Sequence, residues 1–535
     1  MNVELVYNIL DIFATMQDAV KQMESAYSDG RTEMFNMLAT DLQDGLNAVK
    51  HIAEQNVPVG STIRLADQCV CALESLKDIR KLATENPEKV SWKLEYELGS
   101  ILEIGAQQLY YWGIVDGHPE EKEKFEEFLA DSDMFRILKI PAQEREYACD
   151  LSIVVTGYNH LDVTKLCVAS ILDNLPEGII YELILQNHGS HDGTKEYFES
   201  IQRARTINVA VNGAVPGIVL KACRGKYLLH ISNDVVIGKH AIDNLYRCAA
   251  THPDYGFIVP STPNVSNLQT IPANYGSLEQ FTAFAENNNV YDEKSHEQRV
   301  RLCNPLDIVS IDIYLKAYFE LYEDMFFDKK VMASFPDDKF SLWMRRNGYK
   351  NILAKDSYCH HFGSVTLKHD LGKEEEQTQL YIAGRKAFYD KFHVDPWGTG
   401  FCFDPDLFSQ WKIDRKDNAC VLGINCGLGS NSLKVKEILR EKGAHDVILY
   451  NCVQDQRYLQ DLRGVSDKAF LFENLQDLVR LTGRSHYNYI VIEDPVSKIT
   501  PDSLMQELEK AGLEFNELAC KMPDGTWKIV VEQKN

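Results

Sequence analysis

The chain is predicted to be a multi-domain α/β protein, because its pattern of apolar residues changes twice. Residues 1 to about 130 carry apolar side chains at helical spacing, whereas compact apolar strands alternate with helices from Asp150 onward. A polar stretch at 412–418 precedes a second alternation of strands and helices. The expected domains are an N-terminal helical bundle at 1–145, a central mixed but mostly parallel α/β domain at 146–412 and a C-terminal Rossmann-like α/β unit at 413–535.

The composition argues against several classes of protein. Among 535 residues, 79 are acidic and 56 basic, a formal net charge of −23, so broad binding to nucleic acid or to an anionic lipid surface is not expected. No apolar run approaches the roughly 18 residues of a membrane span, and the N-terminus lacks the basic and apolar regions of a signal peptide. The 13 cysteines are scattered at spacings that fit no common zinc motif. We therefore expect no integral membrane segment and a location in the reducing cytoplasm.

The N-terminal region predicts four helices followed by an acidic fifth. The expected helices run from Val3 to the turn at Ser28–Gly30, from Met34 to before Pro58, from a cap at Ser61 or Thr62 to about Glu85, from Trp92 to Ile114, and over 119–130. Such a bundle is typical of a structural or dimerising module, and docking of a protein partner is the alternative. A homo-oligomer formed through the bundle is therefore one expectation.

The central region predicts parallel strands that end in polar residues. The expected strands are 151–155, 181–185, 206–211 and 226–231, with helices at 162–174 and from about 194. The last strand runs into Ser232-Asn233-Asp234, and a buried carboxylate there is costly unless it meets a cation, a hydrogen-bond donor or water. Ligands of open α/β sheets lie at the carboxyl ends of strands. Asp234 is therefore a candidate ligand-binding residue, with a simple turn as the alternative.

Several motifs follow one another in this region. They are Ser152–Asn159, Asn187–Thr194 (Asn-His-Gly-Ser-His-Asp-Gly-Thr), Ala222–Asp234, Phe335–Tyr349 with the later His360–Ser364, and the closing Ala387–Phe392. In this order they resemble glycosyltransferase family 2, whose A-type fold binds nucleotide sugars. The resemblance covers roughly residues 150–400 and implies a nucleotide-sugar donor and an acceptor hydroxyl.

The resemblance implies a divalent cation, Mn²⁺ or Mg²⁺, held by Asp234 and His361, with His360 as the alternative histidine. Such an ion neutralises the charge that develops on a nucleotide diphosphate leaving group. These ions take hard oxygen ligands and few of them from protein, and an imidazole suits Mn²⁺. Ser232 stands where the family has a first acid. Metal binding would therefore rest mainly on Asp234.

The resemblance also implies an inverting transfer, in which one carboxylate takes the proton of the acceptor hydroxyl. Asp338 is the expected base, and Asp337 is the alternative. Both acids stand at the start of a predicted helix, so capping of that helix is the structural alternative to a catalytic role. Asn187 replaces the Asp that usually contacts uracil, which weakens the preference for UDP over GDP or dTDP. Its amide oxygen still accepts a hydrogen bond from the base, so uridine fits and UDP stays the favoured nucleotide. The residues implied to bind the nucleotide sugar are Thr156, Tyr158, Asn159, Asn187, Ser190, Asp192, Lys221, Arg224, Ser232 and Asn233.

The C-terminal region contains a glycine-rich turn after a strand. Val421–Ser430 resembles the first motif of class I methyltransferases, in which Gly-x-Gly lets the backbone approach a cofactor, and Tyr487–Asp494 resembles a later strand. The acid expected to hold the cofactor ribose is replaced by Asn451. A degenerate module for scaffolding or acceptor recognition is therefore expected, with an active methyltransferase as the alternative.

The predicted function is a cytoplasmic, metal-dependent inverting glycosyltransferase. It would move a hexosyl or N-acetylhexosaminyl group from a nucleotide diphosphate sugar to an acceptor hydroxyl, on a protein such as flagellin or on a surface glycan. One alternative is a non-catalytic scaffold derived from a glycosyltransferase. The other is a bifunctional glycosyltransferase–methyltransferase.

Overall fold

A computed structural model describes residues 1–58, 61–138, 140–209, 220–326, 335–363, 374–493 and 501–531. The chain divides into two compact units. The first unit comprises Met1–Val168, Gly178–Asn233 and Tyr318–Val331, and the second comprises Ala169–Glu177, Asp234–Ala317 and Met332–Asn535. Within the described ranges no helix combines the length and the apolar character that a bilayer span requires.

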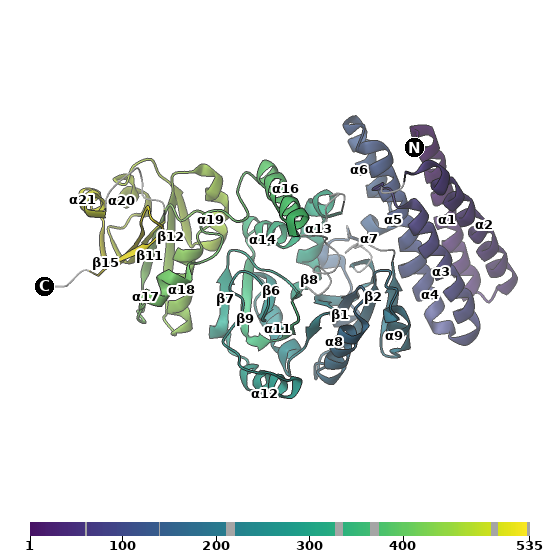
Figure 1. The fold of residues 1–535 in the computed structure, drawn as a ribbon, viewed down its shortest axis with the longest axis horizontal. Helices are drawn as coiled ribbons and strands as arrows, with labels where there is room; N and C mark the ends of the chain where they lie inside the picture. Colours follow the sequence, from purple (N-terminus) through teal and green to yellow (C-terminus); the bar gives the residue numbers. More distant parts are fainter. Residues whose placement is uncertain are drawn as a thin grey trace. The chain divides into compact units, whose positions relative to one another are not determined.

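The N-terminal part of the first unit is a helical bundle, in which α1 packs on α2 and α5, and α3 packs on the same two helices (Figure 1). The helical elements are α1 (Val3–Ser28), α2 (Thr32–Asn56), α3 (Leu65–Glu85), a continuous run of α4 (Val90–Trp92), η2 (Lys93–Leu98), α5 (Gly99–Tyr110) and η3 (Tyr111–Val115), and then η4 (Pro119–Glu121), α6 (Lys122–Asp131) and α7 (Asp133–Leu138). The predicted apolar face forms the core, since Val6, Ile9 and Phe13 are buried. The four predicted helices and the acidic fifth are thus confirmed.

Two details of the bundle differ from the prediction. The third helix begins at Leu65 without a side-chain cap, and the hydroxyl of Ser61 instead accepts a hydrogen bond from the backbone N–H of Ile63, at 3.1 Å. A cap at Ser61 or Thr62 is therefore wrong. The fourth run contains two π-helical turns, η2 and η3, which a 3.6-residue pattern does not anticipate.

The rest of the first unit contains a parallel sheet. Its strands are β1 (Cys149–Gly157), β2 (Tyr181–Asn187), β3 (Arg205–Asn208) and β4 (Gly225–Ser232), and the helices that follow β1 and β2 are α8 (Leu161–Asp173) and α9 (Thr194–Ser200). The strands lie in the order β3-β2-β1-β4 and are all parallel. The predicted alternation of parallel strands and helices is confirmed.

The second unit begins with a mixed sheet. Its strands are β6 (Tyr255–Ser261), β7 (His296–Arg299), β8 (Leu306–Ser310) and β9 (Lys350–Tyr358), with a separate small pair of β5 (Val235–Val236) and β10 (His360–His361). β6 and β9 are parallel, whereas β8 pairs with β6 and β7 with β9 in the antiparallel sense. The helices of this part are α11 (Ala241–Thr251), α12 (Leu278–Asn288), η6 (Glu293–Ser295), α13 (Ile311–Phe326), α14 (Pro336–Arg346) and α16 (Glu374–Phe392).

The C-terminal part of the second unit is a doubly wound sheet. Its strands are β11 (Cys420–Ile424), β12 (Ile448–Val453), β13 (Lys468–Leu471), β14 (His486–Ile492), β15 (Glu514–Lys521) and β16 (Trp527–Val531). They lie in the order β13-β12-β11-β14-β15-β16, and all but β16 are parallel. The helices are α17 (Pro405–Gln410), α18 (Ser430–Glu441), η8 (Gln456–Tyr458), α19 (Leu459–Val465), α20 (Asp477–Thr482) and α21 (Pro501–Lys510).

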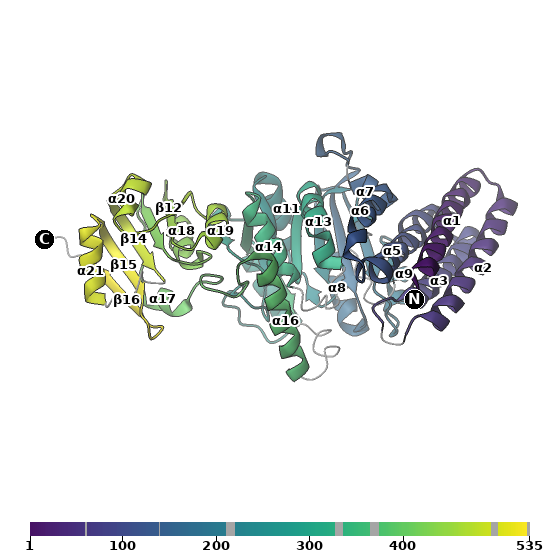
Figure 2. The ribbon, with the colours of Figure 1, turned by 90° about the horizontal axis from the view of Figure 1, so that it is seen from above.

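Helices cover both faces of this C-terminal sheet (Figure 2). Leu433 of α18 and Leu462 of α19 pack with Val421 on one face, whereas Leu478 of α20 and Leu508 of α21 share the core of the other face. The strand order reverses between β11 and β14, the place where doubly wound sheets bind ligands. The chain therefore has the strand order expected of a Rossmann-like unit.

Candidate functional site

Three parallel strands of the first unit end side by side in polar residues. In the strand register Thr156 lies opposite Ser232, and Gly157 lies opposite Asn187. The hydroxyl of Thr156 lies 3.1 Å from Nε2 of His230, on the neighbouring strand β4. Ligands of such sheets lie at the carboxyl ends of the strands. The ends of these three strands, with Thr156, Asn187 and Ser232, are therefore the candidate donor site of the first unit and are called the nucleotide edge below. The structure brings Thr156, Asn187 and Ser232 together there.

The loop after β1 is held against this edge by its own polar side chains. The backbone N–H of Asn159 donates to the hydroxyl of Ser190 at 2.8 Å, and Oδ1 of Asn159 accepts from the backbone N–H of His191 at 2.9 Å. Nδ2 of Asn233 donates to the carbonyl of Asn159 at 3.0 Å and to the hydroxyl of Thr164 at 2.7 Å. Asn159, Ser190 and Asn233 therefore lie close together, and their hydrogen bonds fix the shape of the loop.

The amide of Asn187 is oriented from the helical bundle. Its Oδ1 accepts from the backbone N–H of Ser190 at 3.1 Å, and its Nδ2 donates to Oδ1 of Asn208 at 3.1 Å. The backbone N–H and Nδ2 of Asn208 in turn donate to the carboxylate of Glu97, at 2.8 and 3.3 Å. Glu97 is fully buried in the bundle and also binds Lys93 at 3.0 Å. The sequence does not mark Glu97 as part of this edge, because its partner Asn208 lies more than a hundred residues away.

Asp192 and Tyr158 differ in how the structure uses them. The carboxylate of Asp192 accepts hydrogen bonds from the backbone N–H of Leu161 at 2.8 Å and from the hydroxyl of Thr194 at 2.7 Å. Burial raises the pKa of Asp192, but these hydrogen bonds outweigh that effect and lower it below its usual value. Asp192 therefore caps the starts of α8 and α9, whereas the half-buried Tyr158 lies on the loop next to Asn159.

Lys221 and Arg224 lie away from the nucleotide edge. Arg224 precedes β4 and binds Glu182 at 3.1 Å, at the opposite end of the strand from Ser232. Seven residues of strand correspond to about 23 Å. Nζ of Lys221 donates to the carbonyl of Glu95 at 3.4 Å, in the helical bundle. The prediction that these two cations contact the donor is therefore not supported by their positions.

In the second unit, Asp234 and His361 lie next to each other. The backbone carbonyl of Asp234 accepts from the N–H of Phe362 at 3.0 Å, and the pairing of β5 with β10 sets Val235 opposite His361. This places Oδ2 of Asp234 at 3.2 Å from Nε2 of His361, and both side chains are buried. His360 is used differently, since its Nδ1 lies 2.7 Å from the hydroxyl of Tyr275. His361, and not His360, therefore lies beside Asp234, while its role as a metal ligand stays a prediction.

The Asp234–His361 pair is a suitable donor set for a divalent cation. Two neighbouring ligands of an octahedral ion, each at about 2.1 Å, lie about 3 Å apart, and the observed separation is 3.2 Å. One carboxylate oxygen and one imidazole nitrogen suit Mn²⁺. Within the described ranges, no three His, Cys, Asp or Glu side chains are arranged so that they could hold a metal ion together. An ion here would therefore take most of its ligands from a diphosphate and from water.

The two candidate bases open α14. Phe335, the residue before this helix, has a left-handed backbone with φ of 57°, and its ring packs at 4.8 Å from that of Trp397. A bulky residue in this conformation costs about 1 kcal/mol or more, and such strain is typical of functional segments. The closing motif, Ala387–Phe392, forms the C-terminal end of α16. Ser364 of the histidine motif lies outside the described residues.

The carboxylates of Asp337 and Asp338 have different surroundings. Asp338 forms a buried bidentate pair with Arg301, with Nε to Oδ1 at 2.5 Å and Nη2 to Oδ2 at 3.3 Å. Burial raises the pKa of Asp337 to about 7, and the neighbouring Asp338 adds to this effect while Arg301 opposes it. Arg301 was not predicted, and its only signal in the sequence is the alternation of cations in Arg299-Val-Arg301.

The glycine-rich turn of the C-terminal sheet contacts the chain's own backbone. The N–H of Leu428 donates to the carbonyl of Thr399 at 2.9 Å, and the N–H of Ser430 donates to the carbonyl of Gly400 at 3.0 Å. A Cβ on Gly427 would come within 2.0 Å of that Thr399 carbonyl, so the close approach that glycine allows is used here. Residues 399–400 thus occupy N–H groups that would otherwise be available to a cofactor.

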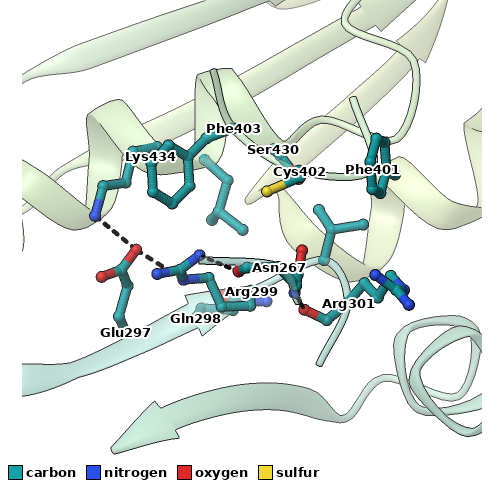
Figure 3. A pocket seen from close by; sticks show the side chains of 12 residues that line it. Asn267, Glu297, Gln298, Arg299, Arg301, Phe401, Cys402, Phe403, Ser430 and Lys434 are labelled. Atoms are coloured by element: carbon teal, nitrogen blue, oxygen red, sulfur yellow. Dashed lines mark hydrogen bonds and ion pairs between the residues drawn. The ribbon is translucent and has the colours of Figure 1, made fainter. Parts of the chain in front are cut away.

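The residues that follow are fixed between β7 and α18 (Figure 3). The guanidinium of Arg299 and the ammonium of Lys434 each lie 4.7 Å from the ring centre of Phe403. The carboxylate of Glu297 lies 2.9 Å from Arg299 and 2.7 Å from Lys434, so it forms ion pairs with both cations. Asn451, at the position expected of a ribose-binding acid, is buried and accepts from Ser432 at 2.8 Å. These contacts fill the glycine-rich turn and its surroundings with the chain's own groups, while the degenerate methyltransferase-like character stays a prediction.

Glu493, at the end of β14, gives the C-terminal sheet a pH-dependent stability. Burial raises the pKa of Glu493 to about 8, so the folded state holds a proton that the unfolded state loses above its usual value near 4.5. The contribution of Glu493 to the free energy of unfolding is therefore fully present below about pH 4.5, and it is lost as the pH rises toward 8. We expect Glu493→Gln to raise the midpoint of thermal unfolding by about 2 °C at pH 8.5 and not at pH 5.

Thermal scans at both pH values, with the exposed Glu473→Gln as the matched control, measure this effect. If Glu493→Gln raised the unfolding midpoint equally at pH 5 and pH 8.5, the glutamine would act through packing and not by removing the ionisation of Glu493.

Comparison with known proteins adds a family match for part of the chain. Residues 152–298 match the model of the glycosyl transferase family 2. Among solved structures, a crystal structure of GalNAc-T7 with UDP, GalNAc and Mn²⁺ is similar at 10% identity and a TM-score of 0.32. The similarity covers 51% of this chain and 59% of that one, less than two thirds of its length. No curated protein matches the chain.

The family match includes the nucleotide edge and Asp234, whereas Asp337, Asp338 and His361 lie beyond its end. It spans β1 to β7, the strands that carry the first three motifs of the sequence. Residues 152–298 therefore carry the sequence pattern of the glycosyl transferase family 2.

Proposed function

We propose that the central region is a metal-dependent inverting glycosyltransferase that uses a nucleotide diphosphate sugar, with UDP as the favoured nucleotide. The acceptor is a hydroxyl group on a protein or a glycan, and the reaction takes place in the cytoplasm. The family match over residues 152–298 supports the transferase class.

The observation that carries the proposal is the pairing of Asp234 with His361. They are 3.2 Å apart although more than a hundred residues separate them in the chain, and the antiparallel pair of β5 and β10 brings them together. A cation bound there neutralises the diphosphate leaving group. The nucleotide edge formed by Thr156, Asn187 and Ser232 would hold the nucleoside.

We further propose that Asp337, and not Asp338, is the general base. A base works best when its pKa lies near the working pH, and the pKa of Asp337 is about 7. Both carboxylate oxygens of Asp338 face the guanidinium of Arg301. Taking up a proton would weaken that buried ion pair, so Asp338 is better suited to holding Arg301 and tuning its neighbour.

A donor-hydrolysis screen tests the proposed function. The full-length protein is incubated with UDP-, GDP- and dTDP-sugars in the presence of Mn²⁺, Mg²⁺ or EDTA, and the released nucleotide diphosphate is measured. We expect release from at least one donor, UDP-linked first, and its loss with EDTA. Absence of turnover and of donor binding with every nucleotide would favour the scaffold alternative.

A further inference from the structure

We propose that Asp461, in the C-terminal part of the second unit, is a positioning residue that fixes α14 and thereby the candidate base at its other end. The inference rests on the proposed transferase function. The C-terminal part would then contribute to the reaction of the central region without binding a cofactor of its own.

Asp461 binds the last two residues of α14. Its Oδ1 accepts from Nη2 of Arg345 at 2.8 Å, and its Oδ2 accepts from Nη2 of Arg346 at 2.8 Å. Asp461 is fully buried on α19, and Arg345 is buried with it. Two guanidinium groups on one buried carboxylate make a directional, charge-assisted contact. One carboxylate thus binds both cations at the C-terminal end of the helix and offsets one of their two charges.

The backbone of α19 fits closely against the same place. A Cβ on Gly464 would come within 2.2 Å of the carbonyl oxygen of Arg345, so no larger residue fits between the two helices. Tyr458, which precedes α19, also packs against an apolar cluster that includes Leu342 of α14 and Phe335, the residue before that helix. The C-terminal part therefore contacts α14 along its length, and Asp461 supplies the polar contact.

The contact continues toward the carboxylates. Nη1 of Arg345 donates to the carbonyl of Val300 at 2.5 Å, and the next residue, Arg301, binds Asp338. Arg301, Asp338 and Arg345 line one small cavity together with Leu428, a residue of the C-terminal glycine-rich turn. A shift of Arg345 would thus displace both the backbone of Arg301 and the helix that carries its partner.

Geometry explains why this position affects turnover. An α-helix transmits a displacement as a rigid rod, and the nine residues from the candidate base Asp337 to Arg345 span only about 12 Å. A general base must lie within hydrogen-bond reach of the acceptor hydroxyl, and a misplacement of about 1 Å costs up to about 10²-fold in rate. Loosening the C-terminal end of α14 should therefore lower kcat more than it raises KM for the donor.

The test compares Asp461→Asn with wild type in two independent measurements. We expect kcat for donor turnover to fall about 10-fold or more while KM for the donor changes less than about 2-fold. We also expect amide hydrogen exchange over residues 336–346 to accelerate at least about 10-fold, with exchange in β11, β12 and β14 unchanged. Asp461→Glu, which keeps the charge, should restore part of both properties.

Asp455→Asn is the matched control, because Asp455 binds Arg457 in a half-exposed pair on the same part of the chain. Unchanged kcat in folded Asp461→Asn, or unchanged exchange in α14, would overturn the inference. Faster exchange throughout the C-terminal sheet would show a merely structural residue and would also overturn it. If wild type has no turnover, the proposed function fails, and the exchange pattern alone decides whether Asp461 holds the helix.

Discussion

The Asp234→Asn variant is expected to lose donor turnover by about 10²–10³-fold at saturating Mn²⁺. The change removes one negative charge beside His361 and keeps the shape of a buried side chain, so the fold should be preserved. Because a divalent ion at this pair must carry the charge of the leaving diphosphate, its loss affects the chemical step directly. Steady-state release of nucleotide diphosphate measures the effect.

Asp254→Asn is the matched control for this variant. Asp254 lies in the same unit, but its ion pair with Lys350 is half-exposed. It should retain full turnover. Equal turnover by Asp234→Asn and wild type would place the metal elsewhere or exclude its participation.

The second large effect is expected at Asp337. Asp337→Asn should lower kcat by about 10²–10⁴-fold, the range of general acid–base catalysis, with little change in thermal stability. In wild type the base works only after losing its proton, so kcat/KM should rise with pH up to about 7 and then level off, as the pKa of about 7 requires. A pH series of initial rates with a saturating acceptor measures this profile.

Asp338→Asn distinguishes the two carboxylates. It leaves the buried guanidinium of Arg301 without its counter-charge, which typically costs about 3–5 kcal/mol of stability. We therefore expect an unstable protein that keeps turnover per folded molecule within about 10-fold of wild type. The opposite pattern, a stable and inactive Asp338→Asn with an active Asp337→Asn, would return the role of base to Asp338.

Much of the fold followed from periodicity alone. The apolar face of α1 and the compact run that became β1 need no long-range information, because each buries its own side chains in a regular pattern. The π-helical turns of the fourth helical run were not predictable, since they depend on packing within the bundle. The two-residue strands β5 and β10 are likewise too short to leave a pattern of their own.

The candidate site was predictable only where its residues belong to local motifs. Asp234 stood out because it ends a predicted strand, and His361 was singled out only through the resemblance to a family motif; the structure places the two side by side. Arg301, Glu97 and Asp461 were missed for a common reason: each acts through a partner far away in the sequence, and spacing along one chain does not encode such pairs. Lys221 and Arg224 show the reverse error, because a cation near a motif was assigned to the ligand although it lies at the other end of the strand.

The most direct test of the central claim is Mn²⁺ binding in the presence of UDP, measured by electron paramagnetic resonance of free and bound Mn²⁺. We predict that wild type binds one Mn²⁺ with an affinity that UDP increases, and that Asp234→Asn and His361→Ala each weaken this binding at least about 10-fold. Binding of equal strength by wild type and both variants, or no UDP-dependent binding by wild type, would contradict the account.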